Sequence, residues 1–143
     1  MNKTLNVKQF AIAWLVVFVI MTIFAYVPMK LEIAPWVVPS STVAQADEMT
    51  KRILIYLARL VASGLFAYIF TKTTEGKEGI GHGFRYGFGI SMFMYVPWLI
   101  SGLGISDWSA TALFTRAIVG IVELVICGGA IAYLFKPAKP AAA

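Results

Sequence analysis

Residues 110–135 read ATALFTRAIVGIVELVICGGAIAYLF, an apolar run that contains only two charged side chains, Arg116 and Glu123. A helix of this length, with about 1.5 Å of rise per residue, is long enough to cross the ~30 Å hydrocarbon core of a bilayer. Ionisable side chains are costly in hydrocarbon, so they are the first place to look for function. The run predicts a membrane-spanning helix with a charged face turned away from lipid.

Three further apolar runs, at 10–27, 53–70 and 84–103, have similar lengths. The 143 residues are 59% hydrophobic and 13% charged, and their mean hydropathy is +0.79, whereas a soluble domain is about 45–50% apolar. The sequence therefore predicts one all-α domain, residues 1–143, which is a polytopic integral membrane protein with four transmembrane helices. An outer loop at 28–52 and a cytoplasmic loop at 71–83 are expected to join them.

Basic residues flank the runs unequally. The side with the termini has seven of them, and the other side has only Lys30, Lys51 and Arg52. By the positive-inside rule, we expect both termini in the cytoplasm. The net charge of +5 is not expected to bind nucleic acid, because these charges flank helix ends. The seven residues are Lys3, Lys8, Lys72, Lys77, Arg85, Lys136 and Lys139.

Charged residues in two of the runs are predicted to share one polar region. In the last run, Arg116, Gly120, Glu123 and Cys127 recur at helical spacing and fall on one face. In the second run, Tyr56, Arg59 and Ser63 align by the same rule. Since the Arg59 side chain is long enough to reach inward, a contact with Glu123 is feasible. The candidate intramembrane polar cluster is Arg59, Arg116 and Glu123.

Three interpretations of this cluster stay open. The charges form a structural ion pair or triad, with Tyr56, Ser63 or Tyr95 completing the hydrogen bonds. Alternatively, they line a polar path or bind an anionic headgroup, a quinone or an ion. In the third interpretation, Glu123 meets a charge on a partner protein.

Small residues recur every fourth position where the third helix is expected to begin. Such a row lets a neighbouring helix approach closely, so we expect the third helix to be the packing centre of the protein. The candidate helix-packing ladder is Gly79, Gly83, Gly87 and Ser91.

No residue pattern predicts a catalytic, metal or cofactor site. His82 is the single histidine and Cys127 the single cysteine, which is too few for a zinc or haem ligand set of the usual kind. We expect His82 to be a solvated loop residue. Asp107 or Ser109 is expected to cap the last helix.

The second half of the chain resembles a family of small four-helix bacterial inner-membrane proteins that have no assigned biochemical role. The resemblance implies a bacterial inner (cytoplasmic) membrane location and supplies no catalytic residues. The matching stretches are Ala67 to Phe70, Glu75 to Lys77, Gly79 to Gly87, Gly120 to Glu123 and Gly128 to Tyr133.

We therefore expect a membrane protein that acts by association, as an accessory or stabilising subunit of a larger membrane complex. Its partners would be the lipid bilayer and either other membrane subunits or further copies of itself. The alternative is an oligomeric transport or permeation protein for an ion or small solute. An enzyme comes third, because the only candidate acid and base, Glu123 and His82, are expected about half a bilayer apart.

Overall fold

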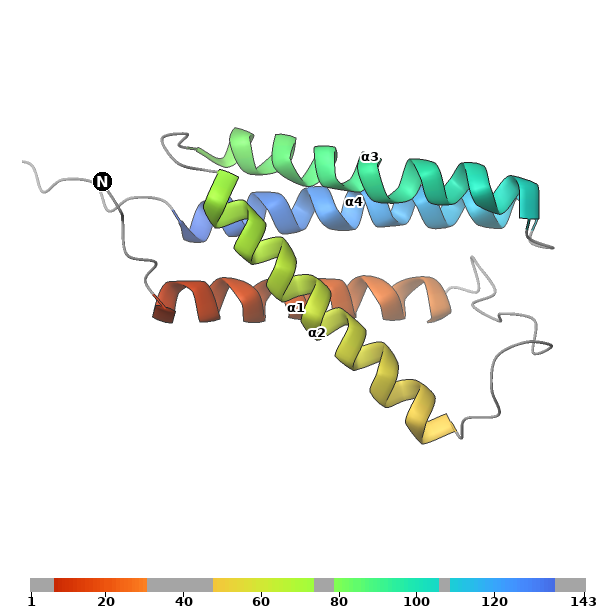
Figure 1. Ribbon diagram of the computed structural model, residues 1–143, viewed down its shortest axis with the longest axis horizontal. Helices are drawn as coiled ribbons and strands as arrows, with labels where there is room; N and C mark the ends of the chain where they lie inside the picture. Colours follow the sequence, from red (N-terminus) through yellow and green to blue (C-terminus); the bar gives the residue numbers. More distant parts are fainter. Residues whose placement is uncertain (1–6, 31–47, 74–78, 106–108, 136–143) are drawn as a thin grey trace, which may run out of the picture.

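The computed structural model describes residues 7–30, 48–73, 79–105 and 109–135, and in them the chain forms four α-helices (Figure 1). All four are long and apolar enough to cross a membrane, which confirms the all-helical prediction. The first three extend two to five residues beyond the predicted spans at both ends. The helices are α1 (Val7–Lys30), α2 (Glu48–Thr73), α3 (Ile80–Ile105) and α4 (Ala110–Leu134).

The ends of α3 and α4 have clear local causes. Gly79 precedes α3 with a φ of 113°, a backbone conformation that favours glycine, and its carbonyl accepts a hydrogen bond from the His82 backbone N–H at 3.1 Å. Ser109 caps α4, where its hydroxyl accepts a hydrogen bond from the Ala112 backbone N–H at 3.2 Å. The capping prediction is thus confirmed for Ser109, while Asp107 lies outside the described residues.

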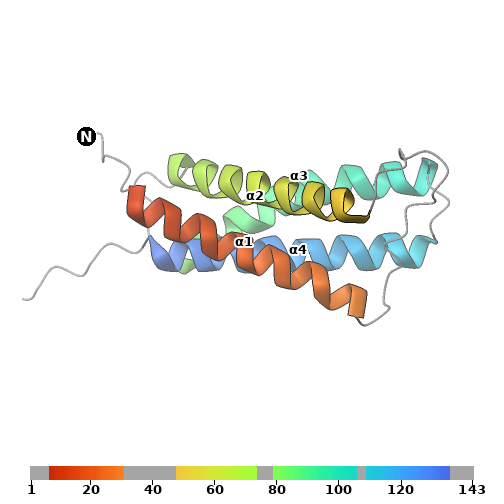
Figure 2. The ribbon, with the colours of Figure 1, turned by 90° about the horizontal axis from the view of Figure 1, so that it is seen from below.

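The helices run up and down, so that one end of the bundle holds the start of α1, the end of α2, the start of α3 and the end of α4 (Figures 1 and 2). At this end, the Gln9 side-chain amide donates a hydrogen bond to the Leu134 carbonyl oxygen at 2.9 Å. This carbonyl belongs to the last turn of α4, where no helical N–H follows to pair with it. Gln9 therefore joins the first helix to the last.

The packing centre is α4, and the expectation that the third helix would hold this place was wrong. Half of the apolar window of α4 that is long enough to cross a membrane is buried, against 11% of the corresponding window of α3. The reason is that α4 packs against both α1 and α3, whereas α3 uses mainly the face that meets α4. The opposite side of α3 exposes large apolar side chains such as Phe88 and Phe93.

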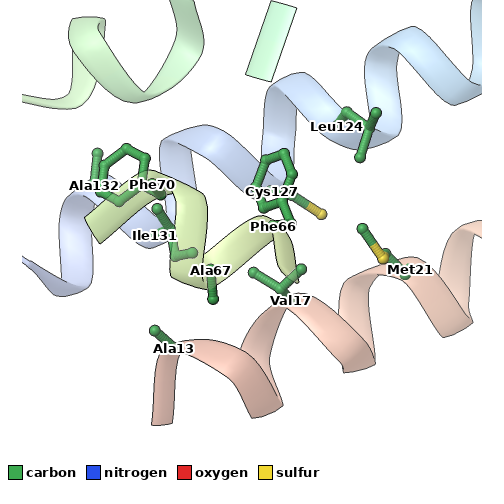
Figure 3. Close-up of a cluster of buried hydrophobic side chains, with 10 residues drawn as sticks. All are labelled: Ala13, Val17, Met21, Phe66, Ala67, Phe70, Leu124, Cys127, Ile131 and Ala132. Carbon is green, nitrogen blue, oxygen red and sulfur yellow. The ribbon is translucent and has the colours of Figure 1, made fainter. Parts of the chain in front are cut away.

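The hydrophobic core lies between α1, α4 and the second half of α2 (Figure 3). Each helix contributes side chains at helical spacing, so that one stripe of each faces the others. The core residues are Ala13, Val17 and Met21 from α1, Phe66, Ala67 and Phe70 from α2, and Leu124, Cys127, Ile131 and Ala132 from α4.

The first half of α2 leaves this core. In Figure 1, α2 crosses α1 obliquely, and its beginning, drawn in yellow, lies away from α3 and α4. Residues 52–62 are exposed except for Arg59, which is half-buried. Of the predicted outer loop, residues 31–47 lie outside the described residues, and of the predicted cytoplasmic loop, residues 74–78 do. The other residues of both loops are helical, apart from Gly79.

Candidate functional site

Two charged side chains of α4 lie on one face, as their spacing predicted. Glu123 is buried, with 9% of its surface exposed, and Arg116 is half-buried. Gly120 lies between them on the same face and is buried as well. The Glu123 carboxylate interacts electrostatically with Arg116 most strongly and with Arg59 next. The structure therefore brings the three predicted charges into one region.

Tyr95 of α3 occupies the space above Gly120. A Cβ atom added to Gly120 would overlap the Tyr95 ring, so the ring lies directly on the α4 backbone. In this position Tyr95 interacts electrostatically with Arg116, Glu123 and Arg59. We call Arg59, Tyr95, Arg116 and Glu123 the polar cluster; its members come from three helices.

Arg59 reaches the polar cluster from α2. It interacts electrostatically with Tyr95, Arg116 and Glu123, and also with Tyr56 of its own helix. Within the described ranges, no ion pair directly joins Arg59 to Glu123, so their attraction acts over a longer distance. The polar cluster thus consists of three charged side chains and one phenol that interact electrostatically with one another.

The hydroxyl groups of Tyr56 and Ser63 bond to α1, away from the charged residues that they were expected to support. Tyr56 forms a hydrogen bond with the Tyr26 hydroxyl. The Trp14 indole N–H donates to the Ser63 hydroxyl at 3.0 Å and to the Leu60 carbonyl oxygen at 2.9 Å. These bonds fix α2 where it crosses α1. Trp14 is only four residues from the start of its apolar run, where an interfacial tryptophan is common, so the sequence carried no signal for this contact.

The row of small residues on α3 faces α4. Gly83 and Gly87 are buried so closely that a Cβ atom on Gly83 would overlap the Gly128 backbone and one on Gly87 would overlap the Leu124 backbone. Ser91 is fully buried, and its hydroxyl donates to the Phe88 carbonyl oxygen at 2.7 Å. Gly79 stands apart, since nothing lies within 4 Å of a Cβ added there. The row is therefore occupied within the chain.

His82 lies in the first turn of α3 and is half-buried, so its predicted place in a solvated loop was wrong. Its ring lies 6.2 Å from the Phe70 ring, between centroids. Its Nε2 atom is buried and has no hydrogen-bond partner in the part of the chain that the structure describes. The helix begins directly after Gly79, so its first turn includes His82.

Among the described residues, no group of three His, Cys, Asp or Glu side chains is placed to hold a metal ion. The polar cluster offers two guanidinium groups, a phenol and a carboxylate. Guanidinium groups bind oxyanions through paired N–H donors, and a phenol can add a further donor. Recognition of an anionic group is the chemistry that these side chains can perform.

Comparison of the chain with protein-family models, curated proteins and solved structures found no match. The resemblance to small four-helix bacterial membrane proteins stays a prediction from the sequence.

Proposed function

We propose that the chain is a multi-pass protein of the bacterial cytoplasmic membrane, with both termini in the cytoplasm, and that it acts as an accessory or stabilising subunit of a larger membrane complex. Four apolar helices and the unequal distribution of lysine and arginine support the membrane placement. Large apolar side chains cover the outward faces of all four helices, as a lipid environment requires.

One observation carries the association proposal. Residues 52–62 of α2 are exposed on all sides except at Arg59, although a helix in a finished bundle normally buries one face. Two small exposed residues, Ala58 and Ala62, lie four apart on this half of α2, a spacing that lets another membrane helix approach closely. Because the row of small residues on α3 is already covered by α4, the first half of α2 is the surface we assign to a partner subunit.

Native mass spectrometry of the protein, extracted gently from its own membrane, tests this proposal. We expect a defined complex with at least one other membrane subunit, and we expect Ala58→Leu and Ala62→Leu to release that subunit. Ala11→Leu is the matched control, because Ala11 is an exposed alanine on α1. A wild-type protein that remains a monomer or a homo-oligomer would remove the accessory-subunit proposal.

The polar cluster favours a second candidate, an oligomeric transport or permeation protein for an ion or small solute. Charged side chains inside a membrane often mark substrate or ion pathways. Four helices leave little room for a lumen, so this function requires several copies. A solute or ion flux into vesicles that Glu123→Gln abolishes, with assembly intact, would favour transport over association.

A further inference from the structure

Arg59 is an unusual side chain for its position. It is half-buried on a stretch of α2 whose other side chains, at 52–62, are exposed and mostly apolar. No hydrogen bond or ion pair to its guanidinium is found within the described residues, and the polar groups that act on it do so through the electrostatic field. A guanidinium carries its charge permanently and has five N–H donors to satisfy. In an apolar setting, an anionic partner stabilises such a group.

The other members of the polar cluster indicate the chemical class of this anionic partner. Arg116, a second guanidinium, and the Tyr95 phenol both lie within electrostatic range of Arg59. The Tyr95 ring is held in place by its close seat on Gly120. Two guanidinium groups and a phenol favour an oxyanion, and a phosphate matches a guanidinium with paired hydrogen bonds.

The arrangement of the helices gives lipid direct access to this place. The first half of α2 lies away from α3 and α4 (Figure 1), and it exposes large apolar side chains such as Leu57 and Leu60. Arg59 is seven residues beyond Arg52, where the membrane-spanning window of α2 begins, which corresponds to ~10 Å along the helix. Because α2 runs obliquely, the depth in a membrane is smaller. At such depths a membrane accommodates arginine by drawing phosphate groups and water inward.

We propose that Arg59, with Tyr95 and Arg116, binds the phosphate group of a phospholipid that carries a net negative charge. The acyl chains lie along the exposed apolar side of α2, and the phosphate meets the guanidinium of Arg59. A zwitterionic lipid has the same phosphate, but it also brings a cation close to two guanidinium groups, so it binds more weakly. This site rests on the membrane placement proposed above. The acyl chains lie on the Leu57 and Leu60 side of α2, which is a different face from that of Ala58 and Ala62, where we place the partner subunit.

The test uses the full chain in lipid nanodiscs made of equal amounts of phosphatidylglycerol and phosphatidylcholine. The lipids that stay bound are counted by native mass spectrometry. We expect the wild type to retain phosphatidylglycerol in preference to phosphatidylcholine. Arg59→Gln should lower this preference about tenfold, as the loss of a charge-assisted hydrogen-bond pair implies. Arg85→Gln is the control, because Arg85 is an exposed arginine near the other end of the bundle, and it should leave the preference unchanged.

Two milder variants keep the test decisive if Arg59→Gln does not fold. Arg59→Lys keeps the charge but loses the paired donors, and Tyr95→Phe keeps the ring on Gly120 but loses the hydroxyl; each should reduce the preference several-fold. Equal retention of both lipids by the wild type, or an equal loss in Arg85→Gln, would overturn the proposal. Inorganic phosphate is the competing ligand. If it displaces phosphatidylglycerol and raises the melting temperature of the protein as much as phosphatidylglycerol does, the site is one for a small anion and the lipid assignment is wrong.

Discussion

The ring of Tyr95 on α3 lies on Gly120 of α4, so closely that a single added methyl group at Gly120 would overlap it. This contact brings the Tyr95 phenol of α3 next to the segment of α4 between Arg116 and Glu123. The polar cluster can form only because residue 120 is a glycine, which has no side chain. The first prediction follows from this contact.

Gly120→Ala should lower the free energy of unfolding by about 1–3 kcal/mol, the usual cost of forcing a methyl group into a packed site. Unfolding in mixed detergent micelles measures this change. Gly89→Ala is the matched control, because nothing lies within 4 Å of a Cβ at that position, and alanine is the better helix former. An equal effect of both substitutions would show that Tyr95 does not lie on Gly120.

Gly83→Ala and Gly87→Ala should each destabilise the protein by about 3 kcal/mol or more, because the atoms in the way are backbone atoms of α4 and cannot rotate aside. Gly81→Ala on the same helix should be neutral, since its Cβ would meet nothing within 4 Å. The measurement is again the free energy of unfolding in micelles. If Gly87→Ala left this value unchanged while a partner subunit was lost, the row would face the partner instead of α4.

The hydrogen bonds from Trp14 to α2 should contribute modestly to stability. We expect Trp14→Phe to cost about 1 kcal/mol, because hydrogen bonds between membrane helices are weak on average. Ser63→Ala removes one acceptor and leaves the Leu60 carbonyl oxygen in place. A double-mutant cycle of the two substitutions should give a coupling of about 0.6 kcal/mol. A coupling of zero would mean that the indole does not bond to the Ser63 hydroxyl.

Glu123→Gln should leave the fold intact and raise the retention of anionic phospholipid a few-fold. The carboxylate opposes an anion near Arg59, and glutamine has nearly the same shape without the charge. Native mass spectrometry of the nanodisc sample measures the change, with Arg59→Gln as the variant of opposite sign. A fall in retention with Glu123→Gln would mean that the carboxylate supports the site, for example by holding Arg116 in place, and does not oppose the bound anion.

The proposed topology makes a separate prediction. Reporter proteins fused at Lys139 and in the connection between Gly104 and Ser109 should lie on opposite sides of the membrane, with the Lys139 fusion in the cytoplasm. The activity of a reporter that works on only one side measures this. Two fusions on the same side would exclude four spans.

Much of the fold could be predicted from the sequence, because a span is a local property. The apolar runs gave four helices, and helical spacing placed Arg116 and Glu123 on one face of α4. Spacing does not reveal which neighbour covers a face. The row of small residues on α3 predicted a close approach, but only the structure showed that α4 fills it and has the larger share of buried residues.

The site was harder to predict, because its arrangement depends on how α2 crosses α1. Tyr56 and Ser63 align with Arg59 along the helix, yet their hydroxyl groups bond to Tyr26 and Trp14 of α1. Because α2 runs obliquely, Tyr56 and Ser63 meet α1, whereas Arg59 lies within electrostatic range of the charged residues of α4. The residue pattern of a single helix does not predict the angle at which it crosses a neighbour, because the side chains of both helices set that angle.

The central place of α4 has a consequence for biosynthesis. Since a ribosome makes the helices in chain order, α1 and α3 are synthesised before the helix that both of them pack against. The hydrogen bond from Gln9 to Leu134 closes between the first helix to emerge and the end of the last. Until α4 is released, α1 and α2 can pack against each other but α3 lacks its main neighbour. A polypeptide that stops after α3 would therefore leave the glycine face of α3 uncovered.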